Sequence, residues 1–224
     1  MTPSSVDGDG PLPGLRSVQV AVMAKAPVPG FAKTRLIPAL GAHGAARLQR
    51  RLTCRAIRVA LDAGLGAVTL WCAPDARHRY FRVLERAAGV ACRPQPDGDL
   101  GERMHAAFRW HCPAGPLLLI GTDCPPLRPS HLREAARALL HGDDAVFVPV
   151  DDGGYVLVGL REPRAELFDD VHWSTASVMS ETRERARAAG LTVNELATLW
   201  DLDVPRDLDR LSLPDAEALG VARG

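Results

Sequence analysis

The sequence has no apolar run that approaches the roughly 20 residues needed to cross a membrane. Residues 1–17 also contain no apolar segment of the length that a secretory signal peptide requires. These two absences exclude a membrane-spanning protein. They favour a soluble protein of the cytoplasm, which is a reducing compartment.

Paired cysteines and the common hydrolase motifs are also missing. The five cysteines are odd in number, lie far apart and include no Cys-x-x-Cys pair, which argues against a zinc site or a disulfide framework. No His-Glu-x-x-His or Gly-x-Ser-x-Gly motif occurs, so metalloprotease and serine hydrolase chemistry has no support. The cysteines are Cys54, Cys72, Cys92, Cys112 and Cys124.

The sequence has no excess of charge of either sign. Lys and Arg total 27 and so do Asp and Glu, and no basic stripe is present, so a nucleic-acid partner is not expected. Hydrophobic residues make up 46% of the 224 residues and charged residues 24%. This composition supports one folded domain with a substantial core and excludes general disorder.

What is present is a regular alternation of strand and helix patterns, which is typical of an α/β fold with a mostly parallel central sheet flanked by helices. Residues 1–16 are rich in Gly, Pro, Ser and Asp, which predicts a disordered arm. No later change of composition marks a boundary, so residues 17–224 are expected to form one domain. Strands are predicted over 18–24, 68–72, 90–93, 117–121, 145–149, 155–160 and 191–195, and helices over 44–63, 75–88, 100–110, 129–140, 176–189 and 205–211.

The loop after the first predicted strand combines stiffness with positive charge. Pro27 and Pro29 fix the backbone and Gly30 permits a turn. A strand, a stiff loop and then a helix is an arrangement by which α/β proteins hold phosphates. We therefore predict a phosphate-binding loop; the alternative is a structural loop whose cations are simply solvated. The cations are Lys25, Lys33 and Arg35.

Asp123 follows the most apolar predicted strand, at the carboxyl edge where parallel sheets collect their ligands. Gly121 and Pro125 restrict its backbone. A carboxylate at this position, facing a phosphate loop, predicts a ligand of a divalent cation. The alternative is a turn or helix-capping residue, roles that Asp performs well.

Two further acidic segments lie nearer the C-terminus. Asp152-Gly153-Gly154 provides a carboxylate before a flexible pair of glycines, but it also matches an ordinary hairpin turn. Asp201 and Asp203 are candidates for a second metal ligand, although the residues after them also resemble the start of a helix.

Two more segments offer binding groups. Gly101 and Arg103 lie at the predicted start of the helix over 100–110, a position that attracts anions. Trp173 precedes Ser174 and Thr175, which together could hold a polar acceptor. A core tryptophan followed by a helix cap explains the same residues equally well.

Taken together, these motifs resemble a bacterial family of nucleotide-diphospho-sugar-transferase-like proteins with the Rossmann-like GT-A fold. Some members are called arsenosugar-biosynthesis-type glycosyltransferases, and others were long known only as a domain of unknown function. A more distant similarity is to 2-phospholactate guanylyltransferases and molybdopterin nucleotidyltransferases. The matching segments run from the first strand into the last quarter of the chain: 25–36, 98–104, 120–125, 152–155 and 173–175.

The resemblance implies a nucleotide or nucleotide-sugar donor, a small-molecule acceptor and a Mg²⁺ or Mn²⁺ ion. Asp123, Asp152 and Lys33 are the expected catalytic residues, and Asp123, Asp201 and Asp203 the expected metal ligands. The donor is expected at Lys25, Pro29, Gly30, Lys33, Thr34, Arg35, Gly101 and Arg103. The acceptor is expected at Asp152, Gly153, Gly154, Tyr155, Trp173, Ser174 and Thr175.

Three functions remain open at this point. The family name favours a glycosyltransferase, which moves a sugar from a nucleotide sugar. The Lys-Thr-Arg sequence of the first loop suits equally a nucleotidyltransferase, which adds a nucleoside monophosphate to a phosphate or carboxylate and releases pyrophosphate. The third is a nucleotide-binding module without turnover.

Overall fold

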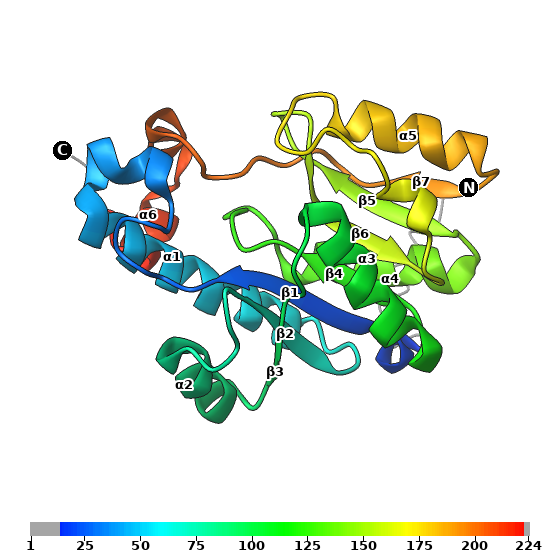
Figure 1. Cartoon of the computed structure of the whole chain (residues 1–224), viewed down its shortest axis with the longest axis horizontal. Coiled ribbons are helices and arrows are strands. Elements are labelled where there is room, and N and C mark those ends of the chain that lie inside the picture. The colour runs from blue at the N-terminus through cyan, green and yellow to red at the C-terminus, as the bar shows by residue number, and fades with distance from the viewer. Residues whose placement is uncertain (1–13, 222–224) are drawn as a thin grey trace, which may run out of the picture.

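The sheet has seven strands in the order β3-β2-β1-β4-β6-β5-β7 (Figure 1). In the computed structural model, which describes residues 14–221, β6 is antiparallel to its neighbours β4 and β5, and every other pairing of these strands is parallel. The predicted mostly parallel sheet is thereby confirmed. The strands are β1 Gln19–Lys25, β2 Val68–Ala73, β3 Ala91–Pro94, β4 Leu117–Ile120, β5 Ala145–Pro149, β6 Tyr155–Leu160 and β7 Val193–Glu195.

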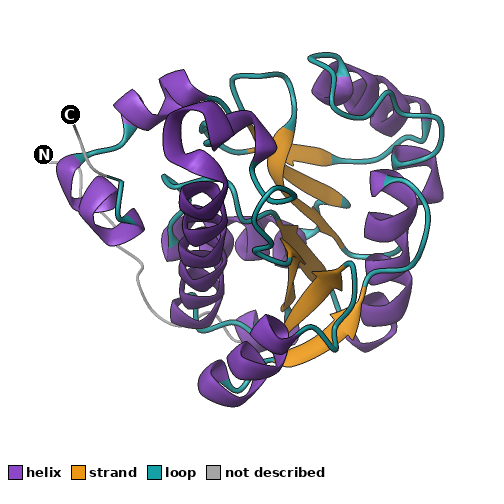
Figure 2. Cartoon of the chain, turned by 60° about the vertical axis from the view of Figure 1, so that its left-hand side comes forward, coloured by secondary structure: helices purple, strands orange, loops and turns teal. Residues whose placement is uncertain are grey.

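Helices cover both faces of the sheet (Figure 2). They are α1 Ile37–Asp62, α2 Arg79–Ala88, α3 Leu100–His111, α4 Pro129–His141, α5 Val178–Ala188 and α6 Leu213–Leu219. Short 3-10 helices are η1 Leu15–Ser17, η2 Thr34–Leu36, η3 Cys112–Ala114, η4 Ala165–Leu167 and η5 Pro205–Arg210. Over residues 14–221, none of the helices combines the length and the apolar character that a membrane crossing demands.

The two faces explain why the central strands are continuously apolar. Along β1, Val20 and Val22 contact the core under α1, α2 and α4, while Ala21 between them contacts the core under α3 and α5. In β4, Leu118 and Leu119 divide in the same way. A strand covered on both faces has no position at which a polar side chain could reach water, so alternation is lost.

Two predicted helix starts and one predicted helix type are wrong. The long helix begins at Ile37 rather than near residue 44, and Gly41, at φ 69°, separates its first turn from the rest. The helix predicted from residue 75 begins at Arg79, because Asp75 accepts a hydrogen bond from the Arg77 N–H and forms a turn. The helix predicted over 205–211 is the 3-10 helix η5.

The helix α6 was not predicted. The backbone is extended at Leu211, and the Ser212 hydroxyl then accepts a hydrogen bond from the Asp215 N–H and starts this new helix. The predicted N-terminal arm over residues 1–16 lies outside the described residues, except for its last three, and Leu15–Ser17 form η1.

His111, at the end of α3, is buried in a polar contact that requires a neutral imidazole. Its Nε2 lies 3.3 Å from Trp71 Nε1, which can only donate, and its Nδ1 lies 2.9 Å from Gln19 Oε1. The Nδ1 therefore carries the proton and the Nε2 accepts. Burial, followed by the positive charge of Arg93, lowers the pKa of His111 to about 4.

We predict that His111 makes the protein lose stability as the pH falls. In the unfolded chain the imidazole takes up a proton below its ordinary pKa of about 6.5, whereas in the folded chain it does so only near 4. The stability that this group contributes is therefore present above pH 6.5 and is lost between pH 6.5 and 4. Going from pH 7.5 to pH 5 should cost about 2 kcal/mol of unfolding free energy.

The measurement is urea unfolding of wild type and His111→Gln at both pH values. The variant is less stable at pH 7.5 but should lose about 2 kcal/mol less than wild type on going to pH 5. If both proteins lose the same amount, His111 takes up its proton in the folded state without cost, and the prediction is wrong.

Candidate functional site

A segment near the C-terminus crosses the carboxyl edge of the sheet, running in Figure 1 from β7 to η5. Leu199 continues the sheet beside β5, since its N–H donates to the Pro149 carbonyl at 2.9 Å. Leu202 is fully buried in an apolar cluster with Leu36 of η2, and its N–H donates to the Asp123 carbonyl at 2.7 Å. This anchoring places Asp201 and Asp203, on either side of Leu202, at the edge of the sheet.

The ammonium of Lys33 joins three parts of this edge. It lies 2.9 Å from Asp123 Oδ2 and 3.8 Å from Asp203 Oδ1, and it also donates to the Leu202 carbonyl. The Lys33 side chain is only 3% exposed, although its backbone is left-handed at φ 48°. A buried charge needs such partners, because its removal from water is otherwise costly.

Arg35 adds a second positive charge on the solvent side. Its guanidinium lies 2.5 Å from Asp203 Oδ2, and the arginine side chain is 65% exposed. Asp207 holds the other side of this turn by accepting from the N–H groups of Asp203 and Val204. The structure thus brings together Lys33, Arg35, Asp123 and Asp203, which the sequence analysis had proposed as site residues.

Asp201 and Asp152 complete the acidic group. Burial and the negative charges of Asp152, Asp123 and Asp203, partly offset by the positive charge of Lys33, together raise the pKa of Asp201 to about 6. Asp152 is exposed and accepts a hydrogen bond from the Gly154 N–H at 2.9 Å. The predicted hairpin turn between β5 and β6 is therefore present, and it stands at the site itself.

The donor set suits a hard divalent cation. Among residues 14–221, no three His, Cys, Asp or Glu side chains are grouped as ligands for one metal ion. The Lys33 ammonium, however, already places a positive charge against Asp123 and Asp203. Mg²⁺ in particular is commonly held by one or two carboxylates together with water and substrate phosphates, so two carboxylates are enough for a shared ion.

A cavity of about 430 Å³ opens at the carboxyl ends of β1, β2 and β3. Phe31, 69% exposed, offers an aromatic face at this cavity. Gln95 uses its amide N–H groups on the carbonyls of Trp71 and Ala24. The lining residues are Lys25, Ala26, Val28, Phe31, Ala73, Pro74, Gln95, Pro96, Asp97 and Arg103.

The cavity unites Lys25 and Arg103, which were predicted from separate motifs, and Arg103 Nε is buried without a hydrogen-bond partner. Phe31 and Gln95 were not among the residues predicted from the sequence. Phe31 could have been predicted as a binding residue, because an aromatic side chain in a Pro/Gly loop is not expected to pack into the hydrophobic core. Pro29 and Gly30 lie exposed in this loop, and Thr34 begins η2 just after it.

The start of α3 differs from the predicted anion site. Asp99 and Glu102 cap it reciprocally, so carboxylates occupy the N–H groups of these two residues and place negative charge where an anion would bind. Gly101 is buried, and a Cβ there would lie 2.6 Å from the Phe168 carbonyl oxygen and 2.9 Å from Trp173 Nε1. Close packing against the indole therefore explains this glycine.

Tyr155 and Trp173 pack against the same apolar cluster and share an unusual feature. The Tyr155 hydroxyl and the Trp173 indole N–H are both buried without a hydrogen-bond partner. The Thr175 hydroxyl instead donates to the His172 carbonyl at 2.6 Å, and Ser174 has a left-handed backbone at φ 65°. Thr175 thus has a local structural role in the turn before α5.

Comparisons with known proteins identify the family and the fold. The model of a family described as "Uncharacterized protein conserved in bacteria (DUF2064)" matches residues 56–175. No curated protein matches the chain.

Among solved structures, a protein from Desulfovibrio desulfuricans G20, described as a candidate nucleotide-diphospho-sugar transferase, superposes with a TM-score of 0.78. It is 26% identical, over 91% of this chain and 96% of that chain.

Two less similar structures share the fold. CMP:2-keto-3-deoxy-manno-octonic acid synthetase complexed with CTP has a TM-score of 0.55 at 14% identity, over 86% of this chain and 95% of that chain. Glucosyl-3-phosphoglycerate synthase from Mycobacterium tuberculosis, in complex with Mn²⁺, UDP and glucosyl-3-phosphoglycerate, has a TM-score of 0.51 at 11% identity, over 93% and 82%. The predicted Rossmann-like GT-A fold and the family resemblance are confirmed.

We predict that Lys33→Met destabilises the metal-free protein by about 1–2 kcal/mol. Loss of a fully buried ion pair would cost more, but Asp123 is 42% exposed and can be partly rehydrated. Urea unfolding in the presence of EDTA measures the effect.

Lys25→Met is the matched control, because Lys25 begins the same loop but is exposed. It should change the unfolding free energy by less than about 0.5 kcal/mol. Equal stability of Lys33→Met and Lys25→Met would show that the Lys33 ion pairs do not hold the edge together.

Proposed function

We propose, on the premise that this chain belongs to the bacterial family DUF2064, that it is a metal-dependent transferase with a nucleotide donor. More specifically, we propose a glycosyltransferase that moves a sugar from a nucleotide sugar to a small-molecule acceptor. One observation carries the proposal: a cavity of about 430 Å³ lies at the ends of β1–β3, and the loop that lines it continues into the Lys33–Asp123–Asp203 group. The base of a nucleotide donor needs a partly apolar cavity, and its charged diphosphate needs charged groups directly beside that cavity.

The nucleoside of the donor belongs in the cavity. Phe31 provides a face on which a base can stack. The side-chain amide of Gln95 donates through its nitrogen to two backbone carbonyls, and its oxygen, Oε1, is left to accept a hydrogen bond from the base. Lys25 and the unpaired Arg103 Nε–H add positive charge and a donor. Groups of this kind suit the sugar and phosphates that follow the base.

The diphosphate belongs beside the acidic group. Asp123, Asp152, Asp201 and Asp203 outnumber the two cations Lys33 and Arg35 at this place, so a bare diphosphate would be repelled. Asp123 and Asp203, with Asp201 as a further candidate, would hold a Mg²⁺ or Mn²⁺ ion. When bound, the ion neutralises the charge that develops on the leaving diphosphate.

Lys33 and Arg35 complement that role. Lys33 keeps the carboxylates of Asp123 and Asp203 together before the donor arrives, and Arg35 is exposed enough to turn towards a phosphate oxygen. Both residues would stabilise negative charge as the bond to the leaving group breaks. Thr34, Pro29 and Gly30 shape the backbone of this loop.

The acceptor belongs on the other side of the acidic group, at the β5–β6 hairpin. Asp152 is exposed, is negatively charged and stands close enough to Asp201 to affect its pKa. It would accept the proton of an attacking hydroxyl. Gly153 lets the Ala176 carbonyl of the turn before α5 pack against the hairpin, and the Tyr155 hydroxyl and Trp173 N–H, which are buried without a partner in the described part of the chain, would donate to a polar acceptor. Ser174 and Thr175 follow Trp173 in the same turn.

Nucleotidyl transfer is the second candidate. The loop after β1 carries three cations, Lys25, Lys33 and Arg35, which is enough positive charge for a triphosphate. In that reaction the acceptor phosphate or carboxylate attacks the α-phosphorus and pyrophosphate leaves.

Thermal shift with a panel of ligands distinguishes the candidates. The panel contains each nucleoside triphosphate and each common nucleotide sugar, with Mn²⁺, with Mg²⁺ and with EDTA. We expect stabilisation by one nucleotide sugar and its nucleoside diphosphate, only when metal is present. Stabilisation by a triphosphate alone would favour nucleotidyl transfer, and binding without any product would indicate a module without turnover.

Asp123→Asn is the diagnostic variant in this panel. It preserves shape and removes the charge, so it should fold normally but lose the metal-dependent part of the shift. Its turnover should fall several hundredfold, corresponding to about 3–4 kcal/mol for a key electrostatic group. An unchanged metal effect in this variant would assign Asp123 to the turn and move the ligand role to Asp201 and Asp203.

We further predict that Asp152→Asn lowers turnover far more than donor affinity. The carboxylate is exposed at the hairpin and has no ion pair with Lys33, so its loss should leave the donor side intact. Steady-state kinetics with calorimetry of donor binding separate the two effects. Asp151→Asn is the control, because Asp151 pairs with Arg210 rather than with the acidic group. Full turnover of Asp152→Asn would reduce the hairpin to a structural turn.

A further inference from the structure

A chain of buried polar side chains leads from α1 to Asp123. Thr122 Oγ1 donates to Asp123 Oδ1 at 2.8 Å. Gln49 Nε2, from α1, lies 3.2 Å from Thr122 Oγ1 and 3.3 Å from Thr53 Oγ1. The Thr53 hydroxyl in turn donates to the backbone carbonyl of Gln49 at 2.9 Å. Gln49, Thr53 and Thr122 are all buried.

The chain has a defined direction of donation. The amide nitrogen of Gln49 can only donate, and it meets the oxygens of Thr53 and Thr122. Thr53 has already used its proton on a backbone carbonyl. The Thr122 hydroxyl must therefore point its own proton towards Asp123, and Gln49 is the group that enforces this.

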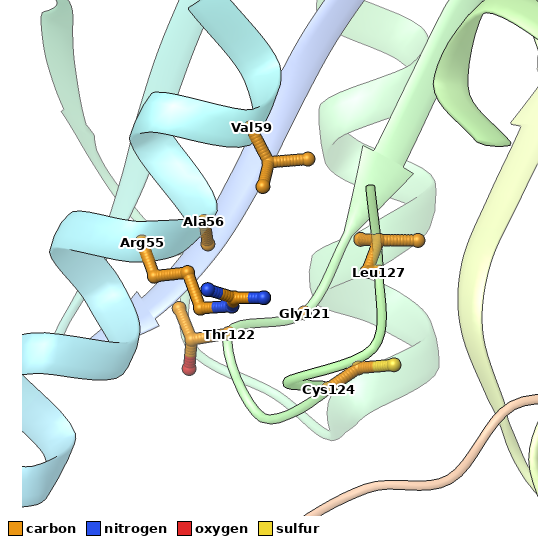
Figure 3. Close-up of a pocket in the computed structure, with 7 residues that line it drawn as sticks. All are labelled: Arg55, Ala56, Val59, Gly121, Thr122, Cys124 and Leu127. Atoms are coloured by element: carbon orange, nitrogen blue, oxygen red, sulfur yellow. The ribbon is translucent and has the colours of Figure 1, made fainter. Parts of the chain in front are cut away.

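The surroundings leave the Thr122 hydroxyl few alternatives. Figure 3 shows Thr122 on the loop that faces Arg55 and Ala56 of α1. The cavity between them has a volume of about 10 Å³, at the lower limit of what holds one water molecule. Arg55 uses its guanidinium on the Pro125 carbonyl and on Asp215, so its charge is directed away from Asp123.

We infer that Thr122, oriented by Gln49, is a positioning residue that sets which oxygen of Asp123 receives a cation. Oδ1 is occupied by the Thr122 hydroxyl, and Oδ2 is the oxygen that faces the Lys33 ammonium at 2.9 Å. A hydrogen bond to one oxygen restrains the rotation of the carboxylate, so Oδ2 stays on the side where a cation binds. This inference rests on the proposed role of Asp123 as a metal ligand.

The inference predicts an effect on metal affinity rather than on folding. Groups that hold a metal ligand in place typically change affinity by about 10- to 100-fold when removed. Thr122→Val keeps the shape and removes the hydroxyl, so it should weaken Mn²⁺ binding roughly tenfold. Thr122→Ser restores a hydroxyl at the same position and should recover most of the affinity.

The experiment titrates Mn²⁺ alone into the protein and follows free Mn²⁺ by electron paramagnetic resonance. Thr182→Val is the matched control, since Thr182 is also a fully buried threonine, whose hydroxyl donates to the Val178 carbonyl in α5. It should lower the melting temperature about as much as Thr122→Val but leave Mn²⁺ affinity unchanged. Gln49→Met should weaken Mn²⁺ less than Thr122→Val does, and it carries the test if Thr122→Val does not fold.

Asp123→Asn shows whether a negative result disproves the proposed metal role of Asp123 or only the positioning role of Thr122. If wild type binds no Mn²⁺ on its own, the carboxylates hold no ion before the donor arrives and this inference falls. If Asp123→Asn binds Mn²⁺ as well as wild type does, the metal role of Asp123 is wrong and the inference falls with it. If Asp123→Asn loses Mn²⁺ while Thr122→Val retains wild-type affinity, the proposed function stands and the positioning role of Thr122 is overturned. Parallel loss in Thr122→Val and Thr182→Val would also overturn it, since the effect would then come from general destabilisation.

Discussion

The ammonium of Lys33 has left water almost completely, and the edge of the sheet is arranged around its partners. Those partners come from the loop after β4 and from the segment over residues 199–203, which are distant in sequence. A charge with 3% of its side chain exposed is tolerated only when such partners stay in place. The same contact therefore closes the fold and gathers Asp123 and Asp203.

The carboxyl edge of the sheet has two different environments, because β6 runs antiparallel to its neighbours and joins β5 by a hairpin at this edge. On the parallel side, β1, β2 and β3 end at a cavity with an aromatic face and unpaired donors. On the other side, the β5–β6 hairpin presents an exposed carboxylate, and Tyr155 of β6 and Trp173 before α5 hold buried donors without partners. The acidic group lies between them. A donor and an acceptor would meet there, which is the arrangement that group transfer requires.

The fold class and most elements could be predicted, because buried strands and amphipathic helices repeat with their own periods. The cluster of Lys33, Arg35, Asp123 and Asp203 could be proposed because each follows a strand or a turn signal. The anchoring by Leu202 could not, since one leucine among many carries no sign of what it packs against. Gln49 and Thr122 were equally hidden, because a hydrogen bond between residues 73 positions apart leaves no local pattern. Gly101 was misleading, as the need for glycine came from packing against Trp173 and the Phe168 carbonyl.

The reversed strand β6 also has a bearing on how such a protein changes over evolutionary time. The parallel strands are joined by helical crossovers, so altering their loops disturbs a packed helix. The residues between β5 and β6 form a simple hairpin, and lengthening a hairpin loop costs little, because the entropy of loop closure grows only slowly with length. The β5–β6 hairpin is therefore the part of this edge that can take up insertions at the lowest cost in stability, and the loops that lead into helices are the parts that tolerate them least.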